Sequence, residues 1–169
     1  MSTPMADEYV PPASPAAYVM WHILEKGFQA GSIIGVAAVV PTLFLWRKVR
    51  EPAALLRAMG YSSLVGVAAT GTLGAVKFLQ IDQAGFEDRA YRLHYNAGQH
   101  RTDTIASAGM ALGFAAAALW LPKGAPSYGL ALVGGSAVGC ALGVAAHLAT
   151  RPEEQRTHNK ALHELKRTD

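Results

Sequence analysis

Few side chains in the hydrophobic parts of this 169-residue chain could do chemistry. Ion or proton pathways through a membrane need ionisable groups within the hydrocarbon. His147, near the end of the last apolar segment, is the one histidine there, and we expect it to bond to a backbone group or lie at the interface. Cys140 is the single cysteine, which excludes a disulfide framework or a cysteine-based metal site within the chain. We expect it to be a small packing residue.

No catalytic motif stands out in the remaining sequence. The string VGGSAVG at 133–139 superficially resembles a dinucleotide-binding turn, but that turn needs a preceding strand and a later acidic residue. Here both flanks continue an apolar helix. The sequence therefore predicts no catalytic residue, no cofactor-binding residue and no metal ligand. A formal net charge of only +3 also argues against nucleic-acid binding.

Two clusters combine basic and aromatic side chains at positions where lipid phosphates would lie. Basic pockets of this kind bind anionic headgroups such as cardiolipin, although ordinary interfacial anchoring would use the same residues. The candidate headgroup residues are Trp46, Arg47, Lys48, Arg50, Arg57, Arg89, Arg92 and Arg101. The second cluster is also dense in hydrogen-bonding groups, which indicates contact with a partner protein through Tyr91, His94, Tyr95, Asn96 and Gln99.

Glycines recur every fourth residue in the apolar segments. This spacing places small residues on one face of a helix, where they let two helix backbones approach closely in lipid. The pattern predicts helix packing through Gly27, Gly31, Gly35, Gly66, Gly74, Gly109, Gly113, Gly135, Gly139 and Gly143.

The elements that carry these residues follow from the distribution of charge. All 27 charged residues lie outside four apolar segments, 27–46, 58–76, 104–121 and 128–150. Each segment is long enough to cross a bilayer as a helix. The rest of the chain is too short to wrap four such helices in a soluble protein. We therefore predict an all-α membrane fold with one four-helix transmembrane domain over 27–150.

The polar segments flank and interrupt this domain. Prolines predict an extended N-terminal segment over 1–26, and 151–169 forms a polar C-terminal tail. Phe86, Ala90 and Leu93 recur at helical spacing, which predicts an amphipathic interfacial segment between helices two and three. We expect Pro41 to kink the first helix, and Asp103 or Thr104 to cap the third. The net charge of the polar segments favours an orientation with both termini outside, whereas their count of Lys and Arg favours both termini inside. We prefer the orientation with both termini outside.

Length, four Gly/Ala-rich helices and glycine ladders resemble the mitochondrial preprotein-translocase-like family. That family includes import-channel subunits and an accessory subunit of respiratory complex I. Its fingerprint has Arg and Asp four apart before a glycine ladder, whereas Arg101 and Asp103 stand two apart before Gly109 and Gly113. No functional residue is therefore carried over. The resemblance implies a mitochondrial inner-membrane location with both termini in the intermembrane space.

Helices without intramembrane charge, joined by polar loops, favour a packing role over chemistry. We therefore expect a non-catalytic accessory subunit of an inner-membrane respiratory complex, most naturally complex I (NADH:ubiquinone oxidoreductase), which binds other membrane subunits and phospholipid. A protein-translocase or small-solute pore subunit is one alternative, in which Ser62, Ser63, Thr70 and Thr72 would line water. A transient assembly or membrane-shaping factor is another.

Overall fold

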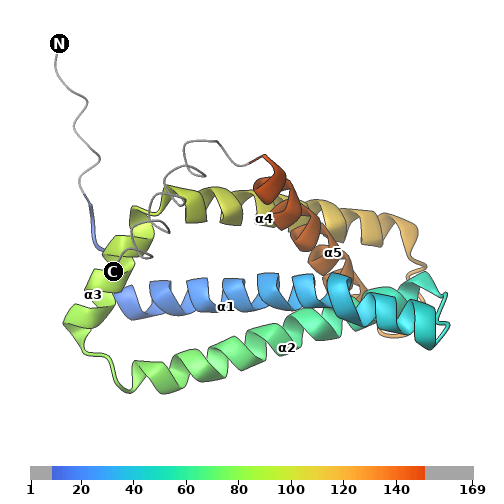
Figure 1. The fold of residues 1–169 in the computed structure, drawn as a ribbon, viewed down its shortest axis with the longest axis horizontal. Helices are drawn as coiled ribbons and strands as arrows, with labels where there is room; N and C mark the ends of the chain where they lie inside the picture. The colour runs from blue at the N-terminus through green and yellow to red at the C-terminus, as the bar shows by residue number, and fades with distance from the viewer. Residues whose placement is uncertain (1–8, 151–169) are drawn as a thin grey trace, which may run out of the picture.

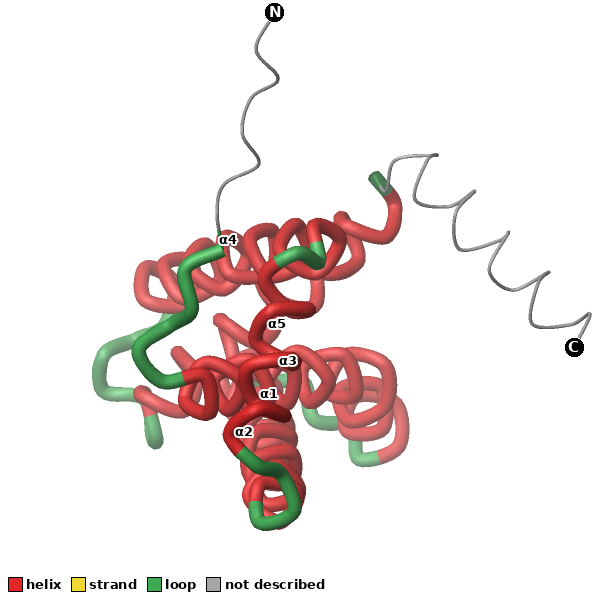
Figure 2. Tube along the Cα trace, turned by 90° about the vertical axis from the view of Figure 1, so that its left-hand side faces the viewer, coloured by secondary structure: helices red, strands yellow, loops and turns green. Residues whose placement is uncertain are grey.

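The chain folds as an all-helical membrane protein. The structure is a computed structural model that describes residues 9–150, and these form helices and loops with no strand (Figure 2). The expected C-terminal tail 151–169 lies outside the described residues. The elements in order are α1 (Pro15–Ile34), the π-helical turns η1 (Gly35–Val39) and η2 (Thr42–Trp46), α2 (Pro52–Phe78), α3 (Gln83–His94), α4 (Ala97–Trp120) and α5 (Tyr128–Ala149).

Four helical spans are long and apolar enough to cross a membrane, which makes this a multi-pass membrane protein. They are Pro15–Trp46, Pro52–Phe78, Ala97–Trp120 and Tyr128–Ala149. At about 1.5 Å per residue, each exceeds the roughly 30 Å thickness of the hydrocarbon core. An even number of spans places the start of α1 and the end of α5 on the same side of the membrane.

Three helices begin earlier than the charge pattern predicted, and one of them is α2, which starts at Pro52 instead of residue 58. α1 starts at Pro15, with Ser14 Oγ accepting a hydrogen bond from the Ala17 amide at 3.3 Å, so the segment expected to be extended through residue 26 is helical over its second half. α4 starts at Ala97, capped by Asn96, so Asp103 lies inside the helix and caps nothing. Charge marks where a helix leaves the hydrocarbon, and a helix can continue beyond that level into the polar interface.

Pro41 lies between the two π-helical turns at the end of the first span. A proline lacks the backbone N–H that would bond to the carbonyl one turn earlier, and its ring crowds that carbonyl. Wider π turns on both sides take up this mismatch without ending the helix. The expected disturbance at Pro41 is therefore a local change of helix type.

The amphipathic segment forms α3. Asp82 caps it, with Oδ1 accepting a hydrogen bond from the Gly85 amide at 2.9 Å. Phe86 and Ala90 are buried, and the Phe86 ring meets the Phe78 ring edge-on at 4.6 Å between centroids. This apolar stripe packs on α1, while the charged face of α3 stays exposed.

The spans form two antiparallel hairpins, α1 with α2 and α4 with α5. α5 crosses obliquely between α4 and the first hairpin (Figure 1), and it packs against α4, α2 and α1. α4 is the outermost span, since its extensive contacts are with α5 alone. The polar start of α4 nevertheless reaches α1 through side chains.

Candidate functional site

Polar residues gather at one end of the bundle, on the side where α1 and α4 begin. We call this region the polar cap; it comprises residues 15–26, α3 and residues 97–103. Lys26 and Asp103 mark its inner boundary, because each directly precedes an apolar segment of its helix. Both lie within the membrane-spanning helices but just outside the apolar segments 27–46 and 104–121, which hold no Lys, Arg, Asp or Glu.

Asp103 is the centre of the cap. Its carboxylate accepts hydrogen bonds from the Lys26 ammonium and from Gln29 Nε2, the latter at 2.9 Å. Gln99 Nε2 donates from one turn earlier on α4, at 3.3 Å to Oδ1. His22 Nδ1 lies 3.5 Å from the other oxygen. These contacts join α1 to α4 at a level where an unpaired charge would be costly.

The cap also contains a set of side chains with metal-ligand chemistry. His22, Glu25 and Asp103 offer ligand atoms that all lie within 4.8 Å of one another. His22 and Glu25 are three residues apart on one helix face, a spacing that the sequence analysis overlooked. Lys26 already binds Asp103, so the ammonium supplies the positive charge that a metal ion would otherwise bring to this carboxylate. Lys26 and Asp103 therefore form an ion pair beside His22 and Glu25.

Arg101, expected at a lipid headgroup, binds the end of α5 instead. Its guanidinium donates to the Thr150 carbonyl at 3.1 Å and to Thr150 Oγ1 at 2.9 Å. It also lies 3.0 Å from Nδ1 of the buried His147 and 3.4 Å from the His147 carbonyl oxygen. A cation at a helix C-terminus satisfies free carbonyls and opposes the negative end of the helix dipole. Arg101 thus fixes α4 to α5.

The residues expected to contact a partner protein have contacts within the chain. Tyr9 places its ring 5.2 Å from both the Tyr91 and His94 rings and 6.3 Å from the Tyr95 ring, measured between centroids. Asn96 caps α4, and Gln99 binds Asp103. Tyr9 therefore lies against the end of α3, although Tyr91 and Tyr95 each keep about half of their surface exposed. Tyr9 could not be predicted from the sequence, because aromatic contacts between distant segments leave no local pattern.

The glycine-rich faces lie at the helix contacts. A Cβ added to Gly31 would lie 2.8 Å from the Ser63 Cα on α2, and one added to Gly143 would lie 2.6 Å from the Ile105 carbonyl oxygen on α4. Comparable conflicts with the backbone of a neighbouring helix arise at Gly27, Gly66, Gly109, Gly113, Gly135 and Gly139. Gly35 and Gly74 instead face the side chains of Met59 and Ile23. Close approach is thus possible only because these residues lack side chains.

The α1–α2 and α4–α5 loops lie on the membrane side opposite the polar cap. These loops and the adjacent helix ends carry basic residues that were predicted to bind lipid headgroups. Arg50 stacks on the Phe44 ring, 3.6 Å from its centroid, and Trp46 is 79% exposed. Arg57 donates a hydrogen bond to the Pro126 carbonyl at 3.2 Å, and its side chain is 23% exposed. Arg89 and Arg92 lie apart from these residues, on α3, where they bond to Gly85 and Asp88.

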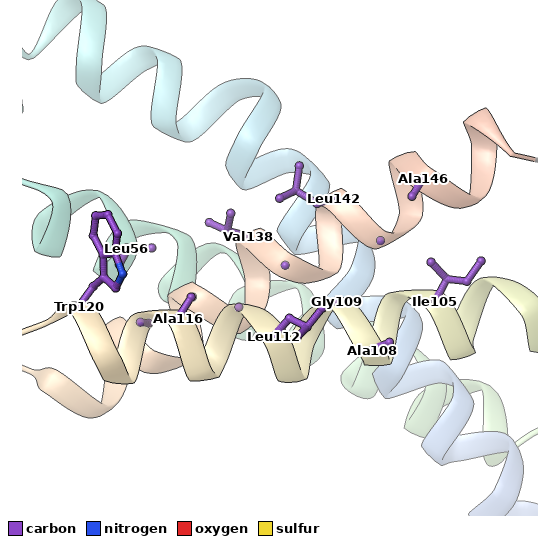
Figure 3. A pocket seen from close by; sticks show the side chains of 15 residues that line it. Leu56, Ile105, Ala108, Gly109, Leu112, Ala116, Trp120, Val138, Leu142 and Ala146 are labelled. Carbon is purple, nitrogen blue, oxygen red and sulfur yellow. The ribbon is translucent and has the colours of Figure 1, made fainter.

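An apolar groove runs along the α4–α5 contact, with a volume of about 660 Å³. Trp120 and Leu56 lie at one end, and Ile105 and Ala146 at the other (Figure 3). Its floor is the glycine contact itself, because residues without side chains leave space beside the crossing helices. The sequence analysis identified the glycines but not the groove, which also depends on α2.

These features define a multi-pass membrane protein built from closely packed helices with a polar cap on one side. Residues 8–150 match a family described as "Protein of unknown function (DUF1757)", and the chain belongs to this family. No curated protein matches the sequence closely enough to be called a relative.

Proposed function

We propose that this protein is a non-catalytic accessory subunit of a large membrane complex, where it supports neighbouring helices and holds phospholipid. The observation that carries the proposal is the internal pairing of the charges that border its apolar segments. Lys26 is bound to Asp103, and Arg101 to the end of α5. A group that moves protons or ions must change its partners, whereas these contacts hold helices in place.

The hydroxyl groups of α2 favour this role over a pore. Ser62 donates to the Gly31 carbonyl of α1 at 2.7 Å, while Ser63, Thr70 and Thr72 donate to carbonyls of their own helix. A hydroxyl that donates to a backbone carbonyl has used its one proton, so it could meet a passing solute only as an acceptor.

The finer assignment is a respiratory complex of the mitochondrial inner membrane, with complex I as the first to examine. Its support is the resemblance in helix number, length and glycine spacing. Here the exposed rings of the polar cap, Tyr91 and Tyr95, would meet other subunits outside the hydrocarbon.

Blue-native electrophoresis of solubilised native membranes tests the proposal. A tagged full-length chain should migrate with a large complex, and its purification should recover the subunits of that complex in constant ratio. The matched variants are Tyr91→Ala, on the exposed cap, and Tyr61→Ala, on the membrane face of α2. Association with the large complex should weaken in the Tyr91→Ala variant and stay unchanged in the Tyr61→Ala variant. Migration solely as a small free protein would overturn the proposal.

A further inference from the structure

The groove between α4 and α5 has the shape and direction of a site for a lipid chain. Ile105 and Trp120, at its two ends, are separated by about 22 Å along the helix axis at 1.5 Å per residue. One leaflet of the hydrocarbon core is about 15 Å deep. The part of the groove nearest Trp120 is therefore long enough for an acyl chain that descends from the headgroup level to the middle of the membrane.

The two ends of the groove differ in the charge that they offer. Arg101 lies one turn before Ile105, but its guanidinium is occupied by His147 and Thr150. At the other end Arg57 directly follows Leu56, a lining residue. Its guanidinium makes one hydrogen bond of 3.2 Å to Pro126 and a 4.0 Å contact with Glu51. Arg57 therefore has N–H groups with which to meet a phosphate.

The loops around Arg57 make this end of the groove more attractive to anionic headgroups. The loops on this side of the bundle carry Arg47, Lys48, Arg50 and Lys123, against the single acidic residue Glu51. A positive field at the headgroup level attracts anionic lipids, and a guanidinium pairs well with phosphate oxygens.

We propose that the α4–α5 groove binds an anionic phospholipid, with one acyl chain beside Ala116 and Leu112 and the phosphate at Arg57. This deepens the lipid-holding part of the proposed function and names its site and its headgroup charge. The glycines have a second role here, because the same missing side chains that bring α4 close to α5 leave room for the chain.

Trp120 provides a local probe. In a Trp21→Phe, Trp46→Phe background it is the only tryptophan, since the chain has three. The full chain is reconstituted in phosphatidylcholine vesicles that contain increasing fractions of a lipid with brominated acyl chains. In one series the brominated lipid is phosphatidylglycerol, and in the other it is phosphatidylcholine. Bromine quenches a tryptophan that it contacts. Half of the maximal quenching should occur at about a fivefold lower fraction of brominated phosphatidylglycerol than of brominated phosphatidylcholine, as expected for one basic contact near the surface.

Matched variants distinguish the groove from the general surface. Arg57→Gln should remove the anionic preference, and Arg50→Gln should keep it. Ala116→Phe should block the groove and remove the preference, whereas Ala115→Phe, on an exposed position of α4 outside the groove, should not. All variants are first compared by thermal unfolding to ensure that they fold.

Three results would overturn the proposal. Equal quenching by both lipids would leave only unselective contact with the bilayer. Equal loss of preference in the Arg57 and Arg50 variants would indicate diffuse surface charge. Absence of quenching together with cross-linked dimers would indicate that a second copy fills the groove. Since the assay uses the isolated protein, its outcome is independent of the electrophoresis that tests the accessory role.

Discussion

Lys26 of α1 and Asp103 of α4 form an ion pair across 77 positions of sequence, at the level where both helices enter their apolar segments. Direct backbone contact between these two helices is slight. The pair and the amide groups around it therefore join the outermost span directly to the first, in addition to the link through α5.

Neutralising one member of this pair should destabilise the protein more than removing both. Lys26→Met or Asp103→Leu alone leaves a partly buried charge without its partner, and we expect each to cost about 2 kcal/mol of unfolding free energy. The double variant should cost less than either single variant, because it leaves no unpaired charge. Thermal unfolding in detergent micelles measures all three.

The exposed pair Arg92–Asp88 on α3 is the control for this cycle, since both side chains are more than half exposed. The coupling energy between Arg92 and Asp88 in such a cycle should stay within about 0.5 kcal/mol. Equal coupling in both pairs would contradict a special role for Lys26 and Asp103.

An alanine at Gly139 should separate α4 from α5. The new Cβ would lie 2.7 Å from the Gly109 carbonyl carbon, so we expect a loss of about 1–3 kcal/mol. Gly129 on the same helix has no neighbour within 4 Å of such a Cβ. Gly129→Ala should thus be neutral, or stabilising by up to about 1 kcal/mol through helix propensity. Unfolding of the two variants in the same detergent gives the comparison, and equal stability would refute the close contact.

Removing the charge at Arg101 should loosen the end of α5. Arg101→Gln loses hydrogen bonds to the Thr150 and His147 carbonyls and a favourable dipole interaction, together worth about 1–2 kcal/mol. Hydrogen exchange should accelerate in the last turn of α5 and stay unchanged in α2. Arg101→Lys should restore part of the protection, because it keeps the charge. Unchanged hydrogen exchange at the end of α5 in the Arg101→Gln variant would contradict the role of Arg101 in holding that end.

Cys140 should be protected from thiol reagents in the folded protein. It is fully buried where α5 faces Ser32 of α1. A membrane-permeant maleimide should react on the order of a hundredfold more slowly with it than with an Ala115→Cys side chain in a Cys140→Ala background. Similar rates would mean that α5 does not pack against α1 as described.

The sequence predicts the four spans and the interfacial helix, because long uncharged segments are typical of membrane-spanning helices and a 3.6-residue apolar period is typical of an amphipathic one. It misplaces the starts of α1, α2 and α4, since these helices continue past their apolar segments and carry charged residues such as Lys26 and Asp103 with them. The polar cap could not be predicted, because its contacts join residues whose spacing along the chain follows no rule. His22 and Glu25 are the exception, since their spacing is visible in the sequence.

The outermost position of α4 has a consequence for the order of membrane insertion. When the α1–α2 hairpin leaves the ribosome, Asp103 has yet to be synthesised, so the ammonium of Lys26 lacks its partner from α4. The first hairpin must therefore enter the membrane without this contact. Only the synthesis of α4 supplies it, so this link between the two hairpins is made late in the order of assembly.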